Sequence, residues 1–312
     1  MLINHNGLTI ELLGDPHLGR PFVHGVPLHR RGEREHMVWK DFFQSLETDA
    51  DIHVCMGDLF DKWSVSYDVI VKAAHMYTSS AIVRPKTQFY ILKGNHDWTR
   101  DLERKSAFDV FKMIVSRMPN IHVVDEPKQV GDLLFYPWHP TAKAADEVAK
   151  FKDVSICFGH FDTEFGDHNM VPTGCGIPTI YTGHVHKPDE FTRDGTKVYV
   201  VGSMQPYAHG EEVDDTLYVT VSLDDLKNLD TTNKCVRVIL EEGEVLDDEI
   251  DCLQLTIKKK GSSDVDDTPT VTLGDFDMDT LFRQAFQNAG VTPEITEQVL
   301  EQYHTKRFQN GA

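Results

Sequence analysis

The sequence predicts a layered α/β fold, and two observations support that prediction. Short apolar runs typical of buried strands alternate with helical patterns between positions 8 and 223. Five of these runs end in Gly followed by an acidic, Asn or His residue, at positions 8–13, 52–56, 89–92, 155–158 and 180–182. The early runs are separated by amphipathic patterns at 33–47, 67–83 and 102–118, which predict helices packed on a sheet.

The remaining patterns predict further elements and a domain order. Strand-like runs at 197–201 and 216–221 favour a second sheet packed on the first, and those at 235–240 and 253–257 predict a small β element. An acidic Gly/Ser/Asp segment then precedes two short amphipathic helix patterns. We therefore expect four parts: a main domain at 1–225, the small β element at 226–260, a linker at 261–275 and a helical pair at 276–312. The helical pair either docks on a partner or folds back on its own domain.

Composition excludes several classes of protein. A chain of 312 residues with 40% hydrophobic and 26% charged residues falls in the range of folded proteins, not of fibres or disordered chains. The 31 basic and 50 acidic residues give a net charge of -19, which repels polyanions unless metals or a local basic patch reverse it. Five scattered cysteines without a C-x-x-C pair argue against a disulfide framework or a cysteine zinc site, and fit a reducing cytoplasm.

No apolar run approaches the roughly 20 residues needed to cross a bilayer. The first residues also lack the basic and apolar regions of a signal peptide. The sequence therefore predicts a cytoplasmic protein without a membrane partner.

Ligand-type side chains follow all five glycine-ended runs. The motifs are Gly14-Asp15-Pro16-His17, Gly57-Asp58-Leu59-Phe60-Asp61, Gly94-Asn95-His96-Asp97, Gly159-His160 and Gly183-His184-Val185-His186. The first, second and fourth are weak alone, because an Asp after Gly usually makes a turn and a lone His is usually structural. The third is more specific, and the paired histidines of the fifth favour a metal. Together they are informative, since α/β folds build their sites at the carboxyl ends of strands.

The donor types indicate a metal centre. Carboxylates, imidazoles and one amide, with no thiolate, suit manganese, iron or magnesium better than a closed structural zinc site, although zinc stays open. There are too many ligands for one ion. Two ions about 3.5–4 Å apart, bridged by one carboxylate, would clamp the attacking and leaving oxygens of a displacement at phosphorus.

In this order the motifs resemble those of the calcineurin-like metallophosphoesterases, over positions 8–223. Within that superfamily, Gly14 to Gly19, the second motif and the later Gly202-Ser203-Met204-Gln205-Pro206 resemble the SbcD double-strand-break repair nucleases. The terminal helical pair resembles the segment by which bacteriophage recombination nucleases of this type grip an SbcC-like, SMC-related ATPase. The resemblance implies two packed β-sheets flanked by helices and two divalent ions, manganese first, with magnesium or iron as alternatives.

The resemblance also implies roles for individual residues. Asp15, His17, Asp58 and His186 would hold one ion, and Asn95, His160 and His184 the other, with Asp58 bridging. His96 would stand near the scissile phosphate, and Asp97 would orient its ring. Cellular relatives usually carry His at the position of Asp61, so Asp61 receives no catalytic role.

The expected function is a two-metal DNA phosphodiesterase, an exonuclease with endonuclease activity left open, acting as nuclease subunit of an SbcCD-like complex and as a homodimer. Arg30, Arg31, Arg100 and Lys187 follow the motifs and are expected to meet DNA phosphates, the alternative being solvated helix faces. The same centre could instead act on a small phosphodiester or a phosphoprotein. A non-catalytic scaffold between the ATPase and DNA is the third hypothesis.

Overall fold

The computed structural model describes residues 1–99, 101, 104–164, 168–214, 216–246 and 249–260, with positions 286, 292, 295–297 and 299. Contacts divide the chain into two compact units, Met1–Lys260 and Gly261–Ala312. Nearly all of the described residues belong to the first unit. The linker expected at 261–275 and most of the helical pair expected at 276–312 lie outside the described residues.

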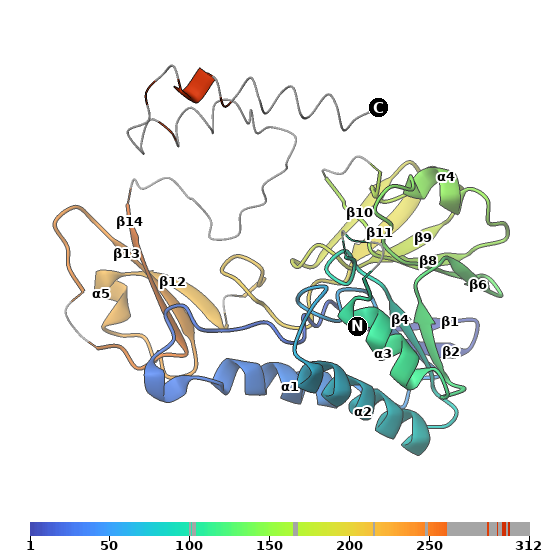
Figure 1. The fold of residues 1–312 in the computed structure, drawn as a ribbon, viewed down its shortest axis with the longest axis horizontal. Helices are drawn as coiled ribbons and strands as arrows, with labels where there is room; N and C mark the ends of the chain where they lie inside the picture. Colours follow the sequence, from blue (N-terminus) through green and yellow to red (C-terminus); the bar gives the residue numbers. More distant parts are fainter. Residues whose placement is uncertain are drawn as a thin grey trace. The chain divides into compact units, whose positions relative to one another are not determined.

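Two large sheets form the body of the first unit (Figure 1). The first sheet has the order β1-β2-β3-β4-β5, with β1 antiparallel to β2 and the other neighbours parallel. Its strands are β1 (Leu2–His5), β2 (Leu8–Leu13), β3 (Ile52–Cys55), β4 (Gln88–Leu92) and β5 (Ile121–Val124).

The second sheet has the order β10-β11-β9-β8-β7-β6, with antiparallel pairs only at its two edges. Its strands are β6 (Lys128–Val130), β7 (Leu133–Tyr136), β8 (Ile156–Gly159), β9 (Thr179–Thr182), β10 (Asp189–Arg193) and β11 (Thr196–Val200).

The two sheets bury one apolar layer between them. Alternate residues of the first sheet, such as Val54 and Tyr90, pack in one cluster with Phe135 and Phe158 of the second sheet. The Tyr90 and Phe135 rings stack with centroids 4.0 Å apart. Because side chains alternate along a strand, the intervening residues face outward and need their own cover. This explains why strands β3, β4, β7 and β8 are buried on both faces instead of alternating buried and exposed residues.

Helices supply that cover. The helices α1 (Glu33–Ser45), α2 (Tyr67–Val83) and α3 (Ala107–Val115) pack on the outer face of the first sheet, and α4 (Ala144–Val148) packs on the second. The α3 helix begins five residues later than the sequence pattern predicts. The reason is a capping box, in which Ser106 and Asp109 satisfy each other's backbone N–H groups.

A third, parallel sheet has the order β12-β13-β14. It consists of β12 (Tyr218–Ser222), β13 (Cys235–Leu240) and β14 (Gln254–Lys259), with the short helix α5 (Leu223–Leu226) between the first two. The small β element therefore includes β12 and starts before residue 226, because β12 pairs with β13 and not with the second sheet.

The layered α/β prediction, two packed sheets flanked by helices, is confirmed. The prediction for α2 matches residue for residue, whereas β1, β5, β6, β7 and β10 were not anticipated. Within the described ranges, no helix is both long and apolar enough to cross a bilayer.

Candidate metal centre

The five motifs meet where the two sheets present the carboxyl ends of their parallel strands. Asp15, Asp58 and Asn95 follow β2, β3 and β4 of the first sheet. His160 follows β8 of the second sheet, and the His184 motif follows β9. Since these strands are parallel within each sheet, the loops lie at one edge, as expected for an α/β site.

One group of donors consists of Asp15, His17 and His186, whose ligand atoms all lie within 4.8 Å of one another. The Nε2 atoms of His17 and His186 are 2.9 Å apart. Asp15 is fully buried, and its Oδ2 accepts a hydrogen bond from the backbone N–H of His184. The other oxygen of Asp15 has no hydrogen-bond partner among the described residues.

The second group consists of Asp58, His160 and His184. The Asn95 Oδ1 atom lies 2.9 Å from both His160 Nε2 and His184 Nδ1, so the amide oxygen joins this group. Asn95 thus lies with the two histidines that the resemblance assigns to the same ion.

Asp58 also forms a third group of possible ligands with His17 and His96, and it stands between the other two. Its Oδ2 lies 3.4 Å from His160 Nε2 and 3.8 Å from His17 Nε2. The residue has φ = 45°, and a Cβ on Gly94 would come 2.1 Å from Asp58 Oδ1. The left-handed turn and the close approach of Gly94 together place one carboxylate where a bridging ligand belongs.

Hydrogen bonds fix which nitrogen of three imidazoles stays free. With its proton on Nδ1, His160 donates to the Met56 carbonyl at 3.0 Å and turns the Nε2 lone pair toward Asp58 and Asn95. His184 donates from Nε2 to Asp162 at 2.7 Å, and His186 donates from Nδ1 to Glu211 at 2.9 Å. Such carboxylate–histidine pairs are typical of metal ligands.

Sequence reasoning missed Asp162 and Glu211. Asp162 comes two residues after His160, so its position was a usable signal. Glu211 belongs to no motif, and only the fold brings it to His186.

Protonation states suit cation binding. Burial raises the pKa of Asp15, and the nearby Asp58 raises it further. For Asp58 burial also acts upward, but His160 and His17 outweigh it and hold its pKa below the ordinary value. Burial lowers the pKa of His17, which keeps that imidazole neutral. Burial likewise lowers the pKa of His160, whereas for His184 burial is outweighed by Asp162, which raises the pKa. Two neutral imidazoles, a shared carboxylate and an Asp15 oxygen without a hydrogen bond fit divalent ions.

His96 is exposed and lies at the mouth of this centre, its ring centroid 4.8 Å from that of His17. Its Nδ1–H donates to the backbone carbonyl of Asp61 at 2.6 Å, which leaves Nε2 free. The expectation that Asp97 orients this ring is wrong. The Asp97 carboxylate accepts instead from the backbone N–H groups of Leu59, Phe60 and Gly94, and so ties the second and third motif loops together.

The four expected DNA contacts fare differently. Arg30 is buried and bonded to Glu33 and Asp251 at 2.7 and 3.1 Å, so it is a structural residue and not a phosphate contact. Arg31 is exposed, and Arg100 lies outside the described residues. Lys187 is exposed and lines a cavity of about 560 Å³ beside His184.

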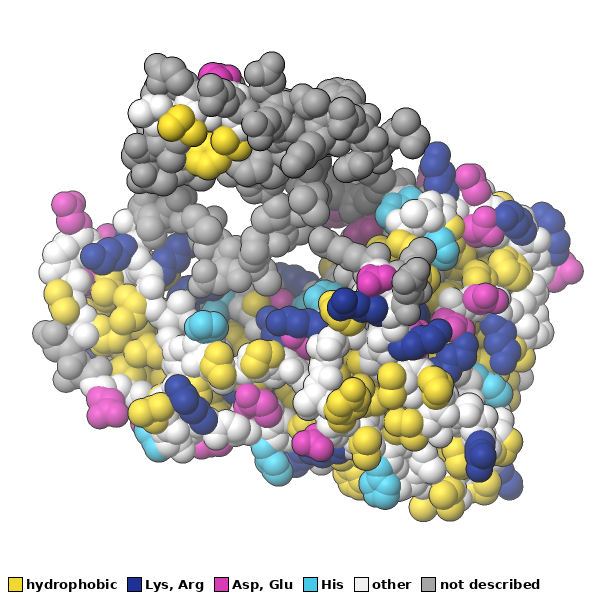
Figure 2. Space-filling model, viewed as in Figure 1, with side chains coloured by type: hydrophobic (Ala, Val, Ile, Leu, Met, Phe, Trp, Pro, Cys, Tyr) yellow, Lys and Arg dark blue, Asp and Glu magenta, His cyan; other side chains and the backbone are white. Residues whose placement is uncertain are grey.

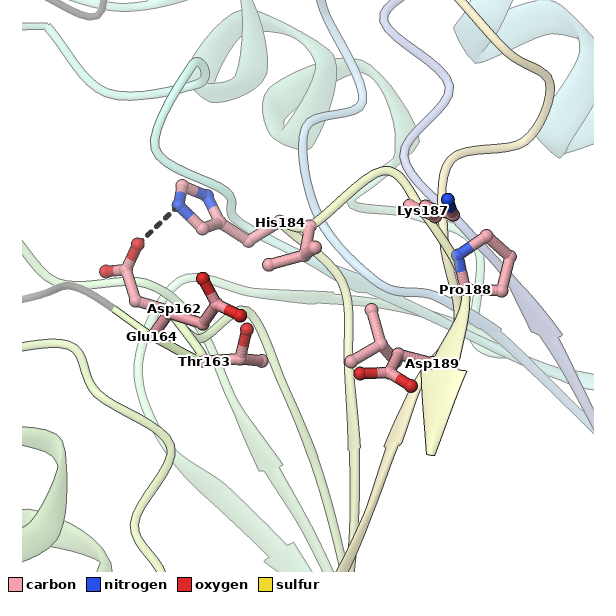
Figure 3. A pocket seen from close by; sticks show the side chains of 9 residues that line it. Asp162, Thr163, Glu164, His184, Lys187, Pro188 and Asp189 are labelled. Carbon is pink, nitrogen blue, oxygen red and sulfur yellow. Dashed lines mark ion pairs between the residues drawn. The ribbon is translucent and has the colours of Figure 1, made fainter. Parts of the chain in front are cut away.

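The same cavity is also lined by three acidic residues, Asp162, Glu164 and Asp189. Figure 3 shows Asp162 turned toward His184, with Glu164 and Asp189 below it. On the face drawn in Figure 2, Lys and Arg side chains are interspersed with Asp and Glu and do not form one broad basic patch. The described side chains on this face therefore do not form the broad positive surface that attracts polyanions.

The later segment from Gly202 to Pro206 reaches the first motif. Ser203 forms an isolated parallel bridge with Asp15, and the N–H of Met204 donates to the Asp15 carbonyl at 3.2 Å. A Cβ on Gly14 would meet the Gly202 carbonyl at 1.9 Å. This segment therefore helps to set the backbone from which Asp15 projects.

Comparison with known proteins agrees with this geometry. A family model described as calcineurin-like phosphoesterase matches residues 8–188. Among solved structures, phosphopantetheinyl hydrolase PptH from Mycobacterium tuberculosis is similar at 13% identity, over 64% of this chain and 93% of that chain, with a TM-score of 0.36. That level of likeness carries no argument about substrate.

Proposed function

We propose that this chain, which belongs to the calcineurin-like phosphoesterase family of metal-dependent phosphoester hydrolases, acts on a DNA phosphodiester. Metal-dependent hydrolysis is best supported by the position of Asp58 Oδ2 between His17 and His160, because one carboxylate is then shared by two groups of donors. When bound there, two divalent ions would offset charge on the phosphate and activate water for in-line attack.

The remaining chemistry belongs to the protein. His96 keeps its Nδ1–H on the Asp61 carbonyl, so Nε2 at the exposed mouth of the centre is the atom that, in the doubly protonated ring, would give its proton to the leaving oxygen or donate to a phosphate oxygen. Asp162 and Glu211 orient His184 and His186 and raise their basicity as ligands. Asp97 holds the Asp58 and Asn95 loops in register.

DNA is preferred over a small phosphoester on the motif signature. The Gly14–Gly19 run and the Gly202–Pro206 segment are those that resemble the repair nucleases, and the latter contacts the backbone of Asp15. An exposed His96 leaves room for a polymer end to approach. Both exonuclease and endonuclease action fit this arrangement.

The wider assembly is proposed on the resemblance alone. An SMC-related ATPase of the SbcC type would bind the terminal helices, and the nuclease would act as a homodimer in the cytoplasm of a bacterial host. Manganese is the proposed ion, since mixed oxygen and imidazole donors suit it; magnesium or iron would use the same ligands.

The test uses the purified full chain, alone and with its ATPase partner, on end-labelled linear duplex in manganese, magnesium or chelator. We expect manganese-dependent shortening that chelator, Asp58→Ala and His96→Ala abolish. Circular dichroism and thermal midpoints of both variants would show that they fold.

Two results would contradict the proposal. Intact DNA beside rapid hydrolysis of a small phosphodiester or a phosphoprotein would assign the centre to that substrate. Failure of the folded wild-type chain to bind two ions would support a scaffold.

A further inference from the structure

Arg20 lies one tight turn beyond the metal-ligand candidate His17. Its backbone N–H donates to the His17 carbonyl at 3.2 Å, and Gly19 between them has φ = 87°. This turn starts the Arg20 side chain beside the centre instead of along an element that leads away from it.

The Arg20 guanidinium is held by two neighbours. Its Cζ lies 5.2 Å from the centroid of the Tyr207 ring, and its Nη1 lies 3.7 Å from Asp61 Oδ1. Tyr207 is buried, donates from its hydroxyl to the Pro16 carbonyl, and packs edge-on against the His17 ring. A guanidinium on such a support loses little conformational freedom when it binds a ligand.

Asp61 connects Arg20 to His96. The backbone carbonyl of Asp61 fixes the His96 ring, and its carboxylate faces Arg20. Asp61 therefore keeps the Arg20 guanidinium and the free Nε2 of His96 on the same side of the site.

The guanidinium still has free hydrogen-bonding capacity. A separation of 3.7 Å from Asp61 is an ion pair without a hydrogen bond. Among the residues that the structure describes, no acceptor takes a guanidinium N–H of Arg20, and the side chain is 25% exposed. A planar fork with free N–H groups matches a phosphate, which it can bind through two parallel hydrogen bonds.

Other nearby cations fit this role less well. Lys93 is buried and paired with Asp109 at 3.0 Å, while Arg34 is buried and bonded to the Pro206 carbonyl. Lys62 is exposed beside Asp61 and has no stacking partner among the described residues. Arg20 is thus a cation that the fold both holds in place and leaves accessible.

We infer that Arg20 binds a non-bridging oxygen of the substrate phosphate and, with His96, sets the phosphate against the metal centre. This inference rests on the proposed function, because it names a further contact of the same phosphoester. It adds a basic residue that none of the five motifs contains.

The experiment compares Arg20→Gln, Arg20→Lys, Asp61→Asn and the charge-matched control Lys62→Gln in manganese-loaded full-length protein. It measures kcat and KM on bis(p-nitrophenyl) phosphate, and calorimetric binding of inorganic phosphate as a readout independent of turnover. Manganese stoichiometry and thermal midpoint are recorded for every variant.

We expect Arg20→Gln to weaken phosphate binding and raise KM by about 10- to 100-fold, as for loss of a charge-assisted contact, with two ions still bound. Arg20→Lys should fall between, because it keeps the charge and loses the fork. Lys62→Gln should change neither quantity by more than about twofold. Asp61→Asn keeps the carbonyl that orients His96 and frees Arg20, so its phosphate affinity should equal or exceed that of the wild type.

Three outcomes would overturn the inference: equal phosphate affinity in Arg20→Gln and Lys62→Gln, equal losses in Arg20→Gln and Asp61→Asn, or no phosphate binding by the loaded wild type. The proposed function fails separately. A wild type that binds phosphate through Arg20 but cleaves neither DNA nor the diester would reject the proposed nuclease activity and leave the phosphate contact standing.

Discussion

The two sheets of the body supply different donors to the site. The first sheet supplies all the oxygen donors, namely Asp15, Asp58 and Asn95, whereas the second supplies three of the four imidazoles. The oxygen donors are placed by backbone turns and close glycine approaches. The imidazoles of the second sheet are each placed by an acceptor on their other ring nitrogen, namely Met56, Asp162 and Glu211.

Substitutions in the two sheets should therefore impair the metal centre in different ways. A change in the first sheet moves a donor itself, while a change behind the second sheet alters the tautomer or basicity of a donor that stays in place. Metal titration and stability measurements can distinguish a displaced donor from a donor with altered basicity.

The largest effect is expected for Asp58→Asn, since the shared carboxylate serves both donor groups. Activity should fall by about 10³-fold or more, because metal ions contribute several kcal/mol to phosphoryl transfer and each 1.4 kcal/mol is about tenfold. Metal content by mass spectrometry should drop with the rate. Asp51→Asn alters a carboxylate near the start of β3 that accepts from the backbone N–H and the hydroxyl of Thr9; it is the control and should retain both ions.

Asp162→Asn and Glu211→Gln should each weaken one half of the centre. Loss of a carboxylate behind a ligating imidazole typically costs about 10- to 100-fold in metal affinity. Calorimetric titration with manganese should show one weakened site in each variant and one that keeps wild-type affinity. If both sites weaken equally in either variant, the assignment of separate partners to His184 and His186 is wrong.

Gly94→Ala should break the oxygen side through packing alone. The added Cβ would meet Asp58 Oδ1 at 2.1 Å and the Asp58 backbone nitrogen at 2.2 Å, so the loop must shift. We expect a loss of about 2 kcal/mol in free energy of unfolding, as for an overpacked core, together with weaker manganese binding. In Gly159→Ala the clash is with the Phe161 ring, so stability should fall with less effect on the ions. Urea unfolding and titration of both variants check this.

The smallest effect concerns a histidine of the first sheet that is not part of the site. His53 on β3 is fully buried, neither ring nitrogen has a hydrogen-bond partner among the described residues, and burial lowers its pKa from 6.5 to about 3. Between pH 6.5 and about pH 3, His53 is protonated in the unfolded chain but not in the folded chain, so the free energy of unfolding falls as the pH falls through this range.

His53→Leu should remove that part of the acid sensitivity. Between pH 7.5 and pH 5.5 the free energy of unfolding of the wild type should fall by about 1.4 kcal/mol more than that of the variant. This corresponds to one pH unit, because pH 5.5 lies about one unit below the pKa of the unfolded histidine. Urea unfolding at the two pH values measures the difference. Parallel losses in the two proteins would show that His53 is protonated in the folded state.

The candidate metal ligands could be picked out because they follow a repeated local signal. A strand that ends in glycine and then a donor can be recognised without its neighbours, so Asp15, Asp58, Asn95, His160 and His184 were all found from the sequence. Glu211 could not be found this way, since its link to His186 spans 25 residues and depends on the loop that Tyr207 anchors. Asp97 was misassigned for a related reason. Adjacency to His96 suggested contact, but the tight turn points the carboxylate to the backbone of the Asp58 loop.

The layered α/β class, the order of the motifs and the chemistry of the candidate donors follow from the sequence, because each depends on local periodicity or residue type. Only the tertiary structure decided the rest. Packing of the two sheets brought the oxygen and nitrogen donors together, buried Arg30 away from solvent, and placed Arg20 and His96 around Asp61. Those relations join residues far apart in the chain, and their distances are set by how the two sheets and their loops pack.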